Sequence, residues 1–336
     1  MLLQPVGMAL RISVIIPVFN AERTLADAVT SVLACPEVER IILVEDGSRD
    51  GSLAVCQALA GEHERVDLIR HPDGGNHGAG ASRNLGLARA ASAYVAFLDA
   101  DDIYLPGRFA AEHRIFAERP DADGVYGAIG VRYLDETGRA QFEAFMDREL
   151  TTVAHEVPPE GLLNALLFVA GFGHFSLDAL TLKRTALDRM PSWFATGLRL
   201  HQDTDLITRA AHHLRLYAGS IHSPVSLRGV HGANRITTNK DVTGTNIKLY
   251  EHLCAWAREQ DLPTRVQEGL KEKYFMWRFR RAALHGGKWS VTKDLFRHRR
   301  LLGNYEIANT YFSLITGNGT WLTDRLVKLA IRTSRY

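Results

Sequence analysis

The sequence has few cysteines, no excess of one charge and no long apolar run. Its three cysteines, Cys35, Cys56 and Cys254, lie far apart and form no Cys-x-x-Cys pair. This pattern excludes a disulfide framework and a zinc site, and it favours a reducing compartment. No segment reaches the ~18 uninterrupted apolar residues that a membrane-spanning helix needs, and residues 1–11 do not resemble a signal peptide. We therefore expect a cytoplasmic protein.

The charge balance also narrows the function. Lys and Arg number 40 against 38 for Asp and Glu, which gives a formal net charge of +2. Such a balance gives no general attraction for nucleic acid, so we expect no nucleic-acid partner. The 336 residues are 46% apolar and 23% charged, as in a globular protein with a substantial core. The length predicts roughly two structural units.

The first third of the chain alternates between strand-like and helix-like apolar patterns. Short apolar runs predict buried strands, and segments with helical spacing separate them. Asn20 is the expected N-cap of the first helix. Strand–helix alternation at this spacing predicts an α/β fold with a mainly parallel sheet. The predicted strands are 12–16, 41–44, 66–69 and 94–98, and the later helices of this part are 52–59 and 81–91.

After Pro106 the pattern is less regular, and from about residue 246 the chain is mostly helical. A boundary near residue 235 divides the sequence into a domain over 1–235, with halves at about 12–105 and 106–235, and a helical region over 236–336. The predicted helices are 109–117, 160–169 and 203–214, and the predicted strands are 124–134, which Gly127 and Gly130 interrupt, and 179–182.

Acidic residues follow the second and the fourth predicted strands. Glu45 and Asp46 come after the second strand, and Asp99, Asp101 and Asp102 come after the fourth. In an open parallel sheet, ligands bind beyond the carboxyl ends of the strands. Carboxylates this close repel one another unless a hard divalent cation compensates their charge. The pattern favours a metal that bridges a diphosphate, and an acidic turn that caps the next helix is the alternative.

A glycine-rich segment, residues 74–80, follows the third predicted strand and opens a helix. A dinucleotide fingerprint would follow the first strand instead, where residues 17–20 contain no glycine, and no GxxxxGK[ST] motif is present. Hydride transfer and P-loop ATPase activity are therefore disfavoured. Glycines at a helix start allow close approach to an anion, and Arg83 one turn later reaches a phosphate. A flexible loop with Arg83 in a surface ion pair is the alternative.

Four segments in order resemble family 2 glycosyltransferases. They are VIIPVFN at 14–20, VEDGSRDGS at 44–52, GASRN at 80–84 and FLDADD at 97–102. The resemblance covers about residues 12–235 and implies a GT-A fold, with the nucleotide-sugar site in its first half and the acceptor site in its second. It also implies transfer of a sugar from a nucleoside-diphosphate sugar, with inversion at the anomeric carbon.

The resemblance assigns roles to single residues of the donor site. Asp46 is the expected partner of the base, and Arg83 lies near the diphosphate. Asp99 and Asp101 match the metal motif, with Asp101 as the direct ligand of Mg²⁺ or Mn²⁺. The nucleotide pocket wall is assigned to Pro17, Phe19 and Glu22, and completion of the metal or phosphate site is assigned to His231 in the segment 228–234.

The acceptor half of the family carries a Glu-Asp pair whose aspartate is the catalytic base. The corresponding stretch here is HQDTDL at 201–206, in which Gln202 replaces the glutamate. Asp203 is then the base that takes the proton of an acceptor hydroxyl, while the metal and Arg83 neutralise the departing diphosphate. The alternative is that Asp203 caps the helix over 203–214, and the two roles are compatible.

The resemblance also suggests what the protein acts on. The Gln-x-x-Arg-Trp motif of processive family members is absent from the sequence, which favours a single addition over polysaccharide extrusion. We expect a UDP-sugar donor, because UDP is the commonest nucleotide in the family, and a glycan or lipid-linked acceptor in cell-surface glycan synthesis. A sugar-nucleotide nucleotidyltransferase and a non-catalytic nucleotide-sugar-binding protein remain as alternatives.

The C-terminal segment 321–335 has the pattern of a basic amphipathic helix. Leu322, Leu326 and Leu329 form one stripe, and Arg and Lys side chains form another. Together with the aromatic and basic run at 274–281, this suits peripheral contact with an anionic membrane on the inner face of the cell. Packing on the catalytic domain, or on a second subunit in a homodimer, is the alternative.

Overall fold

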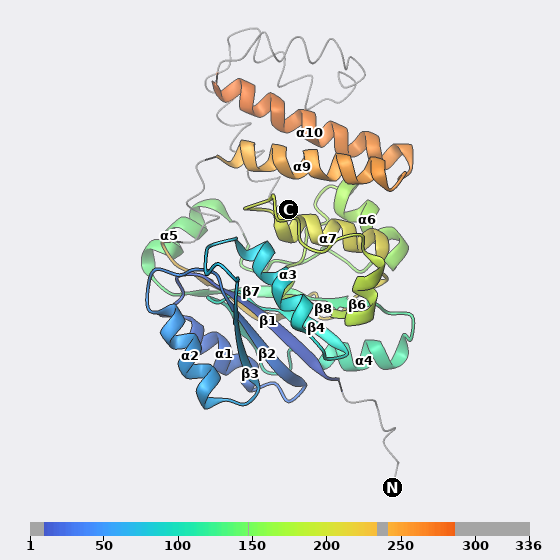
Figure 1. The fold of residues 1–336 in the computed structure, drawn as a ribbon. Helices are drawn as coiled ribbons and strands as arrows, with labels where there is room; N and C mark the ends of the chain where they lie inside the picture. Colours follow the sequence, from blue (N-terminus) through green and yellow to red (C-terminus); the bar gives the residue numbers. More distant parts are fainter. Residues whose placement is uncertain (1–9, 147, 234–240, 286–336) are drawn as a thin grey trace. The chain divides into compact units, whose positions relative to one another are not determined.

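The computed structural model describes residues 10–146, 148–233 and 241–285 (Figure 1). The chain forms two compact units. One contains the residues up to 166 together with 172–237, and the other contains 167–171 and the residues from 238 onward. The boundary predicted near residue 235 and the helix predicted over 321–335 lie outside the described residues.

A seven-stranded sheet forms the centre of the first unit, with the strand order β3-β2-β1-β4-β8-β6-β9 (Figure 1). The strands β3, β2, β1 and β4 are parallel, β8 is antiparallel to β4 and β6, and β6 is parallel to β9. This confirms the expected mainly parallel sheet. The bounds are β1 Ile12–Val18, β2 Val38–Glu45, β3 Val66–Arg70, β4 Tyr94–Phe97, β6 Gly124–Tyr126, β8 Leu180–Lys183 and β9 Leu216–Ala218.

Helices cover both faces of the parallel strands, because β1 and β2 are apolar on both sides. Ile12, Val14, Ile16 and Val18 share one buried cluster with the apolar side of α1, and each such buried side chain contributes about 1.5–3 kcal/mol. On the opposite face, α3 approaches β1 closely at Gly86. The helix bounds are α1 Leu25–Leu33, α2 Ser52–Glu62, α3 Ala79–Arg89 and α4 Ala110–Glu118.

A second, three-stranded sheet lies in the order β5-β10-β7, formed by Ile103–Tyr104, Pro224–Val230 and Ala128–Tyr133. The single strand predicted over 124–134 is wrong, because the chain leaves the large sheet at Gly127 and β7 joins the small one. Strand β10 pairs in parallel with β7, so that Val230 lies opposite Tyr133.

The remaining elements complete the two units. In the second unit, α9 and α10 pack together through buried residues that include Leu253, Leu270 and Trp277. None of the helices in the described part of the chain is long and apolar enough to cross a membrane. The bounds are α5 Glu136–Phe145, α6 Pro159–Phe168, η1 Leu177–Ala179, η2 Arg184–Arg189, α7 Gln202–His213, α9 Val242–Glu259 and α10 Thr264–His285.

The expected N-cap at Asn20 is wrong. Helix α1 begins at Leu25 with Thr24 before it, while Asn20 adopts a left-handed conformation with a φ of 52°. Its side-chain oxygen accepts a hydrogen bond of 2.8 Å from the backbone N–H of Arg49. Asn20 therefore ties the turn after β1 to the turn after β2.

Candidate active site

The acidic turn follows β4, which ends at Phe97. The backbone N–H of Asp102 donates to the carbonyl of Asp99 at 3.1 Å, which closes the turn. The buried Asp102 carboxylate accepts a hydrogen bond of 2.8 Å from the N–H of Gly229. Strand β10 is thereby held against the turn, while the side chains of Asp99 and Asp101 stay 45% and 31% exposed.

A third carboxylate, which the sequence analysis missed, completes the acidic cluster. Asp178 lies in η1 just before β8, and it is buried. One oxygen each of Asp99, Asp102 and Asp178 lies within 4.8 Å of the others. Burial, and then the nearby charge of Asp99, raise the pKa of Asp178 to about 6. A cluster of carboxylates that resists ionisation fits a hard divalent cation, which prefers oxygen ligands and offsets their repulsion.

Asp101, in the same turn, contacts His231. The Nε2 atom of His231 lies 3.2 Å from Oδ2 of Asp101, and this hydrogen bond raises the pKa of His231. The structure therefore brings together the two residues assigned to the metal. It places Asp102 and Asp178, which had no assigned role, beside Asp99.

Arg83 lies inside the site, in α3. Its guanidinium forms an ion pair with Asp99 and lies 5.4 Å from the centre of the Phe194 ring. The side chain is buried, so the alternative of a surface ion pair is wrong. Burial opposes its charge, but Asp99, Asp178 and Asp203 together raise the pKa of Arg83. The arginine is a fixed positive charge among three carboxylates.

Asp203 lies in the first turn of α7 and does not cap it. The N-cap is His201, which has a left-handed φ of 63°, so the capping alternative for Asp203 is wrong. The Asp203 carboxylate is exposed and accepts a hydrogen bond of 2.8 Å from the N–H of Thr204. Its charge contributes to the raised pKa of Arg83. Burial lowers the pKa of His174, and the charge of Asp203 opposes that shift. The charge of Asp203 thus stabilises the positive charge of Arg83, the arginine that forms an ion pair with Asp99.

The start of α7 contacts the start of α3 through Gln202. A Cβ atom at Gly80 would lie only 3.0 Å from the Gln202 side chain, so the glycine permits this close approach. Gln202 is buried, and its amide donates a hydrogen bond of 2.6 Å to the carbonyl of Leu198. A glutamate could not donate this bond, which gives a physical reason for the departure from the Glu-Asp pattern.

Residues 13–176 match the family described as "Glycosyl transferase family 2". This part of the chain is similar to that family. The succinoglycan biosynthesis protein ExoU of Rhizobium meliloti is 29% identical over 208 residues, which are 59% of this chain and 56% of that protein. The putative teichuronic acid biosynthesis glycosyltransferase TuaG of Bacillus subtilis is 37% identical over 32% of this chain and 42% of its own. The chain spans about half the length of these curated relatives.

Solved structures share the fold of this chain. S. aureus TarS 1–349 in complex with UDP-GlcNAc has a TM-score of 0.61 and 15% identity, over 97% of this chain and 89% of that one. The complex of the same protein with UDP has a TM-score of 0.56. At this level of identity the likeness concerns the fold alone, and it confirms the expected GT-A architecture.

The residues assigned to the nucleotide lie at the end of β1 and after β1 and β2. Pro17 is half-buried at the end of β1, and Phe19 beyond it is 39% exposed. The Glu22 carboxylate accepts a hydrogen bond of 3.1 Å from the N–H of Gly51. The buried Asp46 carboxylate accepts hydrogen bonds from the N–H groups of His77 and Gly78 at 2.7 and 2.8 Å. In this structure Asp46 therefore holds the glycine-rich loop against the end of β2.

Proposed function

We propose that the chain is an inverting glycosyltransferase that moves one sugar from a UDP-sugar to an acceptor hydroxyl. The observation that carries this proposal is the position of Arg83, which pairs with Asp99 of the acidic cluster and is acted on by the charge of Asp203. A cationic group between a metal-type carboxylate cluster and an exposed carboxylate suits a reaction in which a diphosphate leaves while a hydroxyl is deprotonated.

Asp203 is the proposed general base. It takes the proton of the acceptor hydroxyl while that oxygen forms a bond to the anomeric carbon from the face opposite the diphosphate. The bond from the anomeric carbon to the diphosphate oxygen breaks, and the diphosphate leaves with the electron pair. The guanidinium of Arg83 opposes the negative charge of the leaving group.

The acidic residues of the turn are the proposed holders of Mg²⁺ or Mn²⁺. When bound, such a cation neutralises charge on the diphosphate oxygens. Asp99 and Asp101 present partly exposed carboxylates to the ligand, with Asp101 as the direct ligand and His231 beside it. Asp102 and Asp178 are buried, and they add their carboxylates to the cluster beside Asp99. The divalent metal is a common requirement of family 2, and the acidic cluster fits it.

The donor nucleotide is proposed to bind against Pro17, Phe19, Glu22 and Asp46. The exposed ring of Phe19 offers an apolar surface to a base. A neighbour of the same fold binds UDP-GlcNAc, and relatives are named for succinoglycan and teichuronic acid biosynthesis. These names support a UDP-sugar donor and a role in cell-surface polysaccharide synthesis.

The acceptor is proposed to be a glycan or a lipid-linked saccharide on the cytoplasmic side of the cell membrane. Helix α10 supports peripheral contact with anionic lipid, because Arg278 lies over the Tyr274 ring at 5.6 Å and Arg281 is exposed. Co-sedimentation of the full chain with phosphatidylglycerol vesicles tests this contact. Equal recovery with phosphatidylcholine vesicles, or a dimer on a sizing column without lipid binding, would count against it.

The decisive test of the function is UDP release from a panel of UDP-sugars, with and without Mn²⁺. A transferase hydrolyses its donor slowly and releases UDP, and the Asp101→Ala variant loses metal-stimulated donor affinity in calorimetry. Release of pyrophosphate from UTP and a sugar phosphate would indicate a nucleotidyltransferase instead. Donor binding without any turnover would indicate a binding protein.

A further inference from the structure

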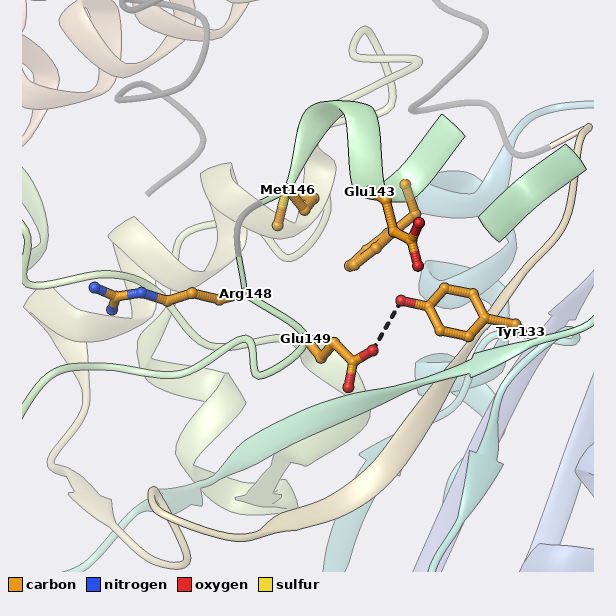
Figure 2. Close-up of a pocket in the computed structure, with 6 residues that line it drawn as sticks. Tyr133, Glu143, Met146, Arg148 and Glu149 are labelled. Carbon is orange, nitrogen blue, oxygen red and sulfur yellow. Dashed lines mark hydrogen bonds between the residues drawn. The ribbon is translucent and has the colours of Figure 1, made fainter. Parts of the chain in front are cut away.

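A cavity of about 240 Å³ lies beside the proposed active site, and nothing so far gives it a role. Figure 2 shows it between the end of β7, helix α5 and the segment that follows this helix. We call it the Tyr133 pocket. The residues that line it are Tyr133, Phe142, Glu143, Met146, Arg148 and Glu149.

Polar groups converge on one side of the Tyr133 pocket. The Tyr133 hydroxyl donates a hydrogen bond of 2.9 Å to Oε1 of Glu149, and the Glu143 carboxylate points toward the same ring (Figure 2). Burial and the Glu149 carboxylate raise the pKa of Tyr133 to about 12, so the phenol keeps its proton at neutral pH. Arg148 extends away from this group (Figure 2). Arg139 pairs with Glu143 at 3.0 Å and lies over the Tyr133 ring. The side chains that meet here therefore offer two carboxylate acceptors, one of them in an ion pair, and one hydroxyl.

Two of the lining side chains are apolar, which narrows the class of ligand. Phe142 is buried and Met146 is half-buried, so they offer carbon surface opposite the acceptors. A pyranose matches this pairing, because its ring has C–H faces and its hydroxyls donate to carboxylates. The volume is below the roughly 300–1,000 Å³ of pockets for drug-sized molecules, which leaves room for one ring. Glu143 is paired with Arg139 at 3.0 Å, so the Glu149 carboxylate is the group that repels a uronic acid or a phosphate.

The Tyr133 pocket lies close to the acidic turn of the proposed active site. Tyr133 lies opposite Val230 in the β7–β10 pair, and the next residue, His231, contacts Asp101. With strands ~4.8 Å apart and ~3.3 Å per residue, the backbones of Tyr133 and His231 are about 6 Å apart. The N-cap of α5, Asp135, also accepts a hydrogen bond from the N–H of Gly232. The pocket is thus joined rigidly to the residues around the acidic turn.

We propose that the Tyr133 pocket is a subsite for one uncharged pyranose unit of the acceptor, next to the unit that reacts. Its assignment to the acceptor rests on the proposed transferase function, whereas its capacity to bind a neutral sugar does not. In this subsite, Glu143 and Glu149 accept hydrogen bonds from sugar hydroxyls. The hydrogen bond from the Tyr133 hydroxyl holds the Glu149 carboxylate in place. Tyr133 is a positioning residue in this arrangement.

Saturation-transfer NMR on the full chain tests the subsite directly. The probes are the methyl glycosides of glucose, galactose and N-acetylglucosamine at millimolar concentration, with methyl glucuronide as the charged counterpart. We expect transfer to at least one neutral glycoside and none to the glucuronide. The Glu149→Gln and Tyr133→Phe variants should bind about tenfold more weakly, roughly the effect of one hydrogen bond to a charged group. Glu118→Gln, which removes an exposed carboxylate on α4, should change nothing.

Two measurements keep the test decisive. Met146→Trp fills the cavity without removing a carboxylate, so it should abolish binding even if Glu149→Gln unfolds. Equal binding by all variants, equal binding of the glucuronide, or no binding of any neutral glycoside would overturn the subsite. UDP release from the donor panel is measured alongside. UDP release without glycoside binding refutes the subsite alone, and glycoside binding without UDP release refutes the transferase and leaves a sugar pocket.

Discussion

The backbone N–H of Asp99 donates a hydrogen bond of 3.1 Å to the buried carboxylate of Asp178. Asp99 follows β4 and Asp178 precedes β8, and the two residues are 79 positions apart in the sequence. Asp178 therefore fixes the acidic turn from behind and adds its own charge to the cluster. This relationship joins the half of the domain proposed for the donor to the half proposed for the acceptor.

Substitution of Asp178 should separate these two effects. Asp178→Asn keeps an oxygen that accepts from Asp99, so the protein should fold, while Mn²⁺ affinity falls at least about tenfold because one charge is gone. Asp178→Ala leaves the buried N–H unpaired and should also lower the free energy of unfolding by about 1–3 kcal/mol. Calorimetric titration and thermal unfolding measure the two quantities. Unchanged Mn²⁺ affinity in Asp178→Asn would separate this residue from the metal.

Asp203→Asn should preserve the fold and donor binding but reduce transfer about 10²–10⁴-fold, the usual value of general-base catalysis. The carboxylate is exposed, so its replacement by an isosteric amide costs little stability. Transfer is measured as acceptor-dependent UDP release, and Asp67→Asn on β3 is the matched exposed control. Normal turnover by Asp203→Asn would remove this residue from the mechanism.

The parallel half of the fold was predictable because its signals are local. Buried runs such as 41–44 are apolar on both faces, and only a parallel sheet covered by helices accommodates them. Helix α5 was missed, since its sequence, ETGRAQFEAF, contains a glycine and few apolar residues. It begins at Asp135, whose side chain accepts from the N–H of Gly138. An aspartate also occurs in many turns, so Asp135 indicates an N-cap only where the residues after it already predict a helix.

The carboxylates of the site were predictable only where they adjoin a strand. Asp99 and Asp101 follow a fully apolar run directly, which marks a sheet edge. Asp178 lies in the short segment between Ser176 and β8, with no pattern that links it to residue 99. The antiparallel pairing of β8 with β4 brings it there. Such non-local pairing is set by tertiary packing and leaves no periodic signal in the sequence.

Gln202→Glu should reveal whether the departure from the family pair is structural. The Gln202 amide donates to the Leu198 carbonyl at 2.6 Å, and an ionised glutamate would place an oxygen against an oxygen. We expect the free energy of unfolding at pH 7 to fall by about 1–3 kcal/mol, the cost of a lost buried hydrogen bond. Chemical denaturation measures it, with the exposed Gln57→Glu on α2 as control. Higher activity at unchanged stability would contradict this explanation.

His213 should make the protein sensitive to acid. Burial, and then His212 and Arg209, lower its pKa from 6.5 to about 4. The unfolded chain therefore binds this proton more readily than the folded one, so stability is complete above pH 6.5 and falls as the pH drops from 6.5 to 4. His213→Gln should reduce the dependence of unfolding free energy on pH in that window by up to one proton. The same slope in wild type and variant would show that His213 does not contribute.

A pair of glycine substitutions tests the packing of α3 on the sheet. A Cβ atom at Gly86 would lie 2.5 Å from Cγ2 of Ile15, whereas one at Gly61 on α2 would meet nothing within 4 Å. Gly86→Ala should therefore destabilise the protein by about 1–3 kcal/mol through overpacking. Gly61→Ala should stabilise it by about 0.5–1 kcal/mol, because alanine has the higher helix propensity. Thermal unfolding compares the two, and because α3 also carries Arg83, Gly86→Ala should weaken donor affinity as well. Equal unfolding temperatures for Gly86→Ala and Gly61→Ala would contradict the close packing of α3 on β1.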